Sequence, residues 1–187
     1  MKKALSNSRL RLVKTDRPGI LRNPSIFLLY PLGTVNIPAI TDKFVVRDHF
    51  AINIKQDVRA KISWIGYNFQ ELFSRKIEEP KIETSLRFFE LKKAEDNKTI
   101  ICELGGEVRV ETTLAEIWWL MDQQGSDKKG PLLLLKGSSN IFYARDYRGE
   151  IQAVFIRWCG DSWYVFVHSA NCPIIWYAGD RIFVRNF

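Results

Sequence analysis

The chain has 187 residues, of which 46% are hydrophobic and 13% aromatic, enough to build the core of a globular domain. The apolar run 25–40 is too short to span a membrane and is broken by prolines, and the first residues lack the continuous apolar segment of a signal peptide. We therefore expect a cytoplasmic protein with no membrane partner.

The net charge of +7 is concentrated at the N-terminus. Residues 1–22 hold seven basic side chains against Asp16, whereas the rest of the chain is nearly neutral. We predict a basic flexible or wrapping arm over 1–24 and a single α+β domain over 25–187, with a candidate internal boundary near 105–112. The basic residues of the arm are Lys2, Lys3, Arg9, Arg11, Lys14, Arg17 and Arg22.

The segment between the arm and residue 93 favours short strands. A helix is expected there as well, since Phe69, Leu72 and Phe73 recur at helical spacing after Asn68, a plausible N-cap. Alternation in 59–65 places Ile62 and Trp64 on one side of a half-buried strand. In chain order the expected elements are a strand at 25–30, a loop to residue 38, and strands at 42–54 and 59–65. A helix at 68–77 and a strand at 81–93 follow.

The clearest helix is predicted over 113–124. Thr113 followed by Glu116 has the spacing of a capping box, and Gly125 supplies a stop. An apolar stripe runs along one side at spacings of three and four residues: Leu114, Ile117, Trp118 and Met121. The preceding segment 107–112 alternates valine with charge, which is typical of a strand.

The last third predicts an antiparallel β-meander. Gly160-Asp161 suits a two-residue hairpin turn that pairs Trp158 with Trp163. Gly149 suits the left-handed position of the preceding turn, which pairs Phe142 with Val154. One face of the meander then holds Phe142, Val154, Ile156, Trp158, Trp163, Val165 and Val167. A final strand at 180–186 extends the sheet. The fold class is thus α+β, a mostly antiparallel sheet with one or two packed helices and the basic N-terminal arm.

The opposite face of the meander is the candidate nucleic-acid or ligand face. Aromatic rings there would stack on planar bases while arginines meet phosphates. The alternative is that the 113–124 helix covers this face, because a sheet of this size usually has one covered face. The candidate residues are Tyr143, Arg145, Phe155, Arg157, Tyr164, Phe166 and His168.

The C-terminal residues resemble a known group of sequences. The segments "NIFYARD" (140–146), "WCGDSW" (158–163) and "FVRN" (183–186), preceded by the helix at 113–124, carry the resemblance. They are similar to a family of uncharacterised bacterial proteins that share this arrangement of Asn-Ile-Phe-Tyr, paired tryptophans and Phe-x-Arg-Asn. The likeness covers roughly residues 60–187 and implies a self-contained bacterial module. It implies no activity, so it assigns no site residues.

Catalytic and metal chemistry find little support in the sequence. Its three cysteines, Cys102, Cys159 and Cys172, are spaced neither for zinc nor for a disulfide framework, and they are interpreted as buried or incidental. At about 3.3 Å per residue, Cys159 and His168 would lie roughly 20 Å apart on the predicted hairpin. The acidic pairs 78–79 and 107/111 are typical of solvated turns and strand edges. We predict no catalytic residues, no metal and no cofactor.

Two functions from different classes remain. The first is a non-enzymatic binding module that associates weakly and non-specifically with nucleic acid through the basic arm. The second is a protein-interaction or assembly module that docks through segment 1–40. A small hydrolase or transferase is the third candidate. The salt dependence of the affinity separates the first two functions. Phosphate contacts release counterions, so nucleic-acid affinity falls as salt concentration rises, whereas apolar docking releases none. The sequence predicts neither the partner nor the oligomeric state.

Overall fold

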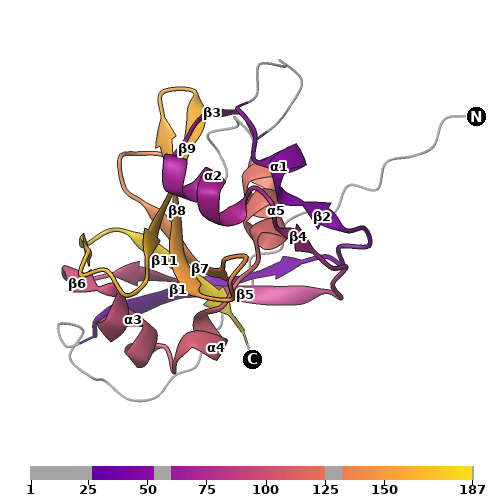
Figure 1. Cartoon of the computed structure of the whole chain (residues 1–187). Helices are drawn as coiled ribbons and strands as arrows, with labels where there is room; N and C mark the ends of the chain where they lie inside the picture. The colour runs from indigo at the N-terminus through magenta and orange to yellow at the C-terminus, as the bar shows by residue number, and fades with distance from the viewer. Residues whose placement is uncertain (1–26, 53–59, 125–131, 187) are drawn as a thin grey trace, which may run out of the picture.

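A seven-stranded sheet forms the centre of the computed structural model, which describes residues 27–52, 60–124 and 132–186 (Figure 1). The strand order is β1-β5-β11-β7-β8-β9-β3, and the pairs β11–β7 and β3–β9 are parallel while the others are antiparallel. The predicted α+β class is confirmed. Its strands are β1 (Leu29–Ile37), β3 (Ile62–Ile65), β5 (Thr84–Leu91), β7 (Asn140–Arg145), β8 (Ile151–Cys159), β9 (Ser162–Ser169) and β11 (Arg181–Arg185).

Short helices lie on both sides of this sheet (Figure 1). Residues of α1, α2 and α5 contribute to one hydrophobic core, and residues of α3 and α4 contribute to a second. The helices are α1 (Val46–His49), α2 (Tyr67–Phe73), α3 (Asn97–Glu103), α4 (Glu107–Val110) and α5 (Leu114–Gln124). Two small ladders complete the fold: β2 (Phe44–Val45) with β4 (Ile77–Glu78), and β6 (Glu95–Asp96) with β10 (Ile175–Trp176).

The predicted register of the meander is confirmed. Trp158 pairs with Trp163 across the β8–β9 turn, and their rings meet edge to face with centroids 5.0 Å apart. Gly160 adopts a φ of 70°, a left-handed value that glycine takes without the strain a Cβ would bring. In the preceding turn Gly149 has a φ of 83°, as its predicted left-handed position requires. The final strand, β11, was expected to extend the sheet. It lies inside the sheet instead, between β5 and β7.

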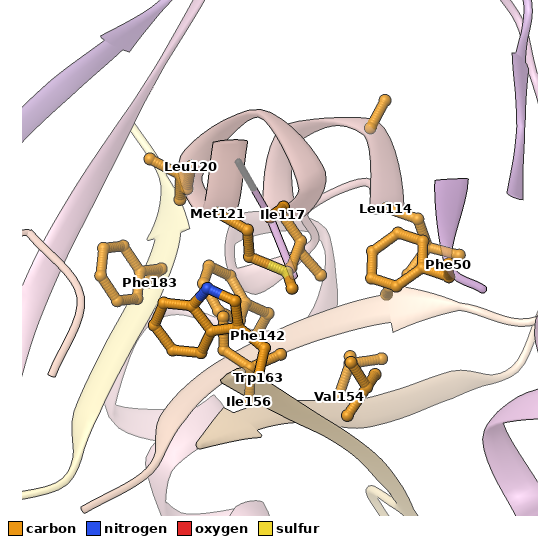
Figure 2. Close-up of a cluster of buried hydrophobic side chains, with 14 of the residues drawn as sticks. Phe50, Leu114, Ile117, Leu120, Met121, Phe142, Val154, Ile156, Trp163 and Phe183 are labelled. Atoms are coloured by element: carbon orange, nitrogen blue, oxygen red, sulfur yellow. The ribbon is translucent and has the colours of Figure 1, made fainter. Parts of the chain in front are cut away.

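The apolar face of the meander packs under α5. Ile117 and Met121 of the helix and Phe142 and Trp163 of the sheet are fully buried and belong to the same core (Figure 2). Helix α5 therefore covers the face that carries no polar side chain in the predicted register. This settles which side of the sheet the helix takes.

Two carboxylates hold the N-terminus of α5. The predicted capping box forms, since Glu116 accepts a hydrogen bond from the Thr113 amide at 2.8 Å and Thr113 Oγ1 accepts one from the Glu116 amide at 3.3 Å. The second carboxylate is Glu78, whose two oxygens accept hydrogen bonds from the amides of Leu114 and Ala115 at 3.1 and 2.9 Å. The interpretation of Glu78 as a solvated turn residue was wrong, because its side chain is buried against the helix end.

The N-terminal half departs from several sequence expectations. The predicted loop that follows residue 30 is part of β1, although it contains Pro31 and Gly33. Proline is tolerated there because β1 is an edge strand, and a register shift between the two residues absorbs the irregularity. The strand expected over 42–54 is the two-residue β2 followed by α1. Val46 and Phe50, four residues apart, both enter the first core, a spacing that a helix brings to one side.

Three helices also differ from prediction. Helix α2 begins at Tyr67 after Gly66, with no side-chain cap, so Asn68 is not its N-cap. Residues 97–103, for which the sequence predicted no element, form α3, which is capped by Asp96: its side chain accepts a hydrogen bond from the Thr99 amide at 2.8 Å. The strand expected over 107–112 is instead the helical turn α4, which buries Val110 and leaves Val108 exposed.

Some predictions lie outside the described residues. The basic arm over 1–24, with all seven of its basic residues, is one of them. Within the described ranges no helix is long and apolar enough to cross a membrane.

Truncation of Trp163 tests the core assignment. Because this side chain is fully buried at the centre of the first core, we expect Trp163→Ala to lower the free energy of unfolding by about 3–5 kcal/mol. Urea unfolding followed by far-UV circular dichroism measures the change without relying on the fluorescence of the removed ring. Tyr177→Ala, at a side chain that is 67% exposed, is the control and should stay within about 0.5 kcal/mol. A loss below about 1 kcal/mol for Trp163→Ala would contradict the assignment.

Candidate ligand-binding surface

The structure divides the predicted ligand face into a buried part and a partly exposed part. Tyr143 and Phe155 are buried in the second core, under the side of the sheet that carries α3 and α4 (Figure 1). The expectation that one face of the sheet would be covered was therefore wrong, since both faces pack against other elements. The half-buried members of the predicted set are Arg145, Arg157, Tyr164, Phe166 and His168.

Tyr143 ties the second layer to the sheet. Its hydroxyl donates a hydrogen bond to Asn97 Oδ1 at 3.0 Å, and Trp176 Nε1 donates to the same oxygen at 2.7 Å. The three side chains come from β7, α3 and β10 and are all buried. Burial, together with the negative charge of Asp96, raises the pKa of Tyr143 well above its ordinary value. The hydroxyl therefore stays protonated and serves as a donor inside the core.

Arg145 is engaged by acidic residues of the α4 region. Its Nε lies 3.1 Å from Glu111 Oε2 and its Nη2 lies 3.3 Å from Glu107 Oε2. Its Nη1 also donates to the Gly149 carbonyl at 2.7 Å. These two glutamates are thus partners of an arginine rather than the solvated strand edge that the sequence indicated. A phosphate would have to displace both carboxylates to reach this guanidinium.

The partly exposed part centres on three rings, Trp64, Tyr164 and Phe166, which we name the aromatic ladder. The Trp64 ring centroid lies 4.6 Å from that of Phe166 and 6.1 Å from that of Tyr164. Phe166 in turn stacks on the buried Phe155 at 4.8 Å and 8° between planes. The ladder is therefore anchored in the second core at one end, while Trp64 at the other end is 41% exposed. Rings held this way present faces at little further cost in conformational entropy.

Trp64 is the residue that the sequence interpretation missed. The alternation of its strand placed it beside Ile62, yet Ile62 is buried in the first core while Trp64 lies against the rings of β9. The cause is a register shift between the two residues in the β3–β9 pair. Such an irregularity turns the following side chain to the other face of the sheet, and no sequence pattern in 59–65 signals it.

Arg157 and His168 flank the anchored end of the ladder. Arg157 Nε donates to Ser139 Oγ at 2.7 Å, and its guanidinium carbon lies 5.5 Å from the centre of the Phe155 ring. The His168 ring stacks on the same phenylalanine, with the centroids of the His168 and Phe155 rings 5.0 Å apart. Burial and the positive charge of Arg157 lower the pKa of His168, so its imidazole is neutral at neutral pH.

The other reactive side chains are scattered. Cys102, Cys159 and Cys172 are free and exposed. Of the two interpretations, buried or incidental, burial is therefore wrong. His49 stacks on Phe44 of the first core and meets the ring of Trp118 in α5 edge to face. Within the described ranges no group of three or more histidine, cysteine, aspartate or glutamate side chains is arranged to hold a metal ion.

Comparisons with known proteins return no match for this chain among protein-family models, curated proteins or solved structures. The resemblance of the C-terminal segments to a bacterial family therefore stays a prediction, and the candidate surface rests on its own geometry.

His168 provides a test of the electrostatics of this surface. Because its folded-state pKa lies below the ordinary 6.5, the unfolded chain takes up this proton first as pH falls. The stability that His168 contributes is present above about pH 6.5 and is lost as pH falls through the lowered pKa. We expect its NMR titration midpoint below 6.5, and we expect Arg157→Gln to raise that midpoint. His168→Gln identifies the resonance, and a midpoint at or above 6.5 would contradict the packing described here.

Proposed function

We propose that the protein is a non-enzymatic binding module for single-stranded nucleic acid, with weak affinity and no sequence preference. The aromatic ladder carries this proposal. Its exposed end is Trp64, at 41% exposure. Each base stacked on an aromatic side chain contributes about 1–3 kcal/mol without regard to base identity. The ladder thus supplies the kind of contact that a sequence-independent binder uses.

The distribution of charge supports the same ligand. Seven basic residues in 1–22 carry most of the net charge of +7, and neutralising phosphates with such residues releases counterions. Each contact contributes roughly −0.7 to the salt slope on single strands, so engaging six to seven phosphates gives a slope of about −4 to −5. The arm would supply most of the affinity, and the ladder would supply a stacking contact that depends little on salt.

An assembly module remains the second candidate, favoured by a separate observation. Residues 29–37 form β1, which pairs with β5 and, among the described residues, with no second strand. An unpaired edge of this kind is a template for strand addition by a partner chain. The irregularity at Pro31 shortens the regular edge, which limits the pairing to the residues that follow. Docking there would respond weakly to salt.

The ladder is tested by removing its exposed ring. We expect Trp64→Ala to weaken binding to a fluorescent oligothymidylate by about 5- to 150-fold, because one stacked base is lost. Fluorescence anisotropy at two salt concentrations gives the affinity and the slope. Tyr147→Ala is the matched control, since it removes an aromatic ring that is 58% exposed in the β7–β8 turn and belongs to no part of the ladder.

The arm is tested in the full-length chain by replacing its seven basic residues with glutamine. We expect the salt slope to become about 4–5 units shallower, while the loss caused by Trp64→Ala stays similar in both backgrounds. If Trp64→Ala binds as tightly as the intact protein, the ladder is not the contact surface. If the arm variant keeps the full slope, the charge that binds phosphate lies elsewhere. Salt-independent self-association with no oligonucleotide binding would favour the assembly module instead.

A further inference from the structure

An open pocket lined by polar side chains, called the cavity below, lies at the end of strands β1, β5 and β11, separated from the aromatic ladder by the width of the sheet. Its volume is about 380 Å³, within the range of small-molecule sites. Strand pairing brings its walls together, because β5 pairs with β1 on one side and with β11 on the other. The lining residues are Asn36, Glu83, Thr84, Ser85, Arg185 and Asn186.

Arg185 is the unusual residue of this cavity. Its Nε and Nη2 atoms are buried and have no hydrogen-bond partner among the described residues. By contrast, the guanidinium of Arg145 meets two glutamates, and that of Arg157 donates to a serine hydroxyl. Buried N–H groups of a charged side chain are costly to leave unpaired, so this guanidinium calls for a partner outside the described residues.

The neighbouring side chains are mostly neutral hydrogen-bonding groups. Asn186 is fixed in place, since its amide donates to the Ser85 carbonyl at 2.9 Å and its Nδ2 donates to Ser85 Oγ at 3.1 Å. Asn36 stands opposite Ser85 in the β1–β5 pair and is exposed at the cavity. Glu83, also exposed, is the acidic residue of the lining. The side-chain amides of Asn36 and Asn186 still have N–H groups that a ligand could accept from. The Thr84 hydroxyl already donates to Glu116 at 3.0 Å.

We infer that this cavity binds a small oxyanion, the carboxylate or phosphate group of a small molecule, with Arg185 as its charged ligand. A guanidinium presents parallel N–H donors in a planar fork that matches two oxygens of either group. Asn36 and Asn186 add neutral donors at the rim. The buried nitrogen atoms of Arg185 gain acceptors when the side chain turns its fork toward the cavity to meet the anion.

A binding arginine leaves a signature in stability that a structural arginine does not. Without its anion, Arg185 holds buried donors that have no acceptor, so Arg185→Gln should leave the melting temperature in chloride buffer unchanged or higher. The same variant should lose the stabilisation that an anion brings. Arg75→Gln, which removes an exposed arginine outside the cavity, matches the change in net charge.

The experiment is a calorimetric melting series of the full chain in phosphate, acetate and chloride at equal ionic strength and pH. At an anion concentration about tenfold above Kd, the intact protein and Arg75→Gln should melt about 3–6 °C higher than in chloride. Arg185→Gln should show no such rise. A rise in phosphate alone assigns a phosphate-bearing ligand, and a rise in acetate alone assigns a carboxylate.

Asn186→Ala gives a second measurement that does not remove the arginine. Because this amide lies exposed at the cavity, we expect the variant to fold and to need a several-fold higher anion concentration for the same rise in melting temperature. The inference is overturned if neither anion raises the melting temperature beyond chloride, or if Arg185→Gln responds as the intact protein does. Oligonucleotide binding through the aromatic ladder is unaffected by either result, because the two surfaces share no residue.

Discussion

The paired register of β7, β8 and β9 is the constraint on which the rest of the structure depends. Pairing Trp158 with Trp163 across Gly160 fixes which side chains share a face. Because side chains alternate along a strand, a slip by one residue would exchange the two sets everywhere at once. Both sets are rich in apolar groups, so both faces need cover. The fold meets this with α1, α2 and α5 on one side and α3 and α4 on the other.

The attachment of α5 shows how the first layer is held at its polar end. Helix N-termini leave amides without intrahelical partners and favour negative charge nearby. Glu78 and Glu116 meet both needs, because their carboxylates accept hydrogen bonds from these amides. Each carboxylate also has a lysine nearby: Glu78 lies 3.2 Å from Lys76 Nζ, and Glu116 lies 3.7 Å from Lys81 Nζ. Strand β4 is thereby tied to a helix more than thirty residues later in the chain. The apolar stripe of α5 packs on the sheet, and the two carboxylates satisfy the amides at its N-terminus. Both interactions hold α5 in the same position.

The sequence predicted best where local signals agree with each other. The meander registers and α5 carry turn chemistry, capping residues and periodicity that all indicate one structure, and they are confirmed. Prediction from the sequence failed where tertiary contacts determine the local structure. Helices α1 and α4 span four residues each, too short for a periodic pattern, and β1 contains a proline that an edge position tolerates. Glu78 was missed because its partners are distant amides that leave no trace in the local sequence.

The candidate surface shows why an aromatic face does not by itself reveal a binding site. Phe155 and Phe166 are opposite each other in one strand pair, yet the first is buried and the second is half-exposed. The difference lies in what covers them, since Trp176 packs on Phe155 while Phe166 meets Trp64 from the edge strand. Trp64 reaches that position because a register shift in β3 reverses its side. A surface of stacked rings therefore arises where regular pairing ends, at the edge of the sheet next to β3.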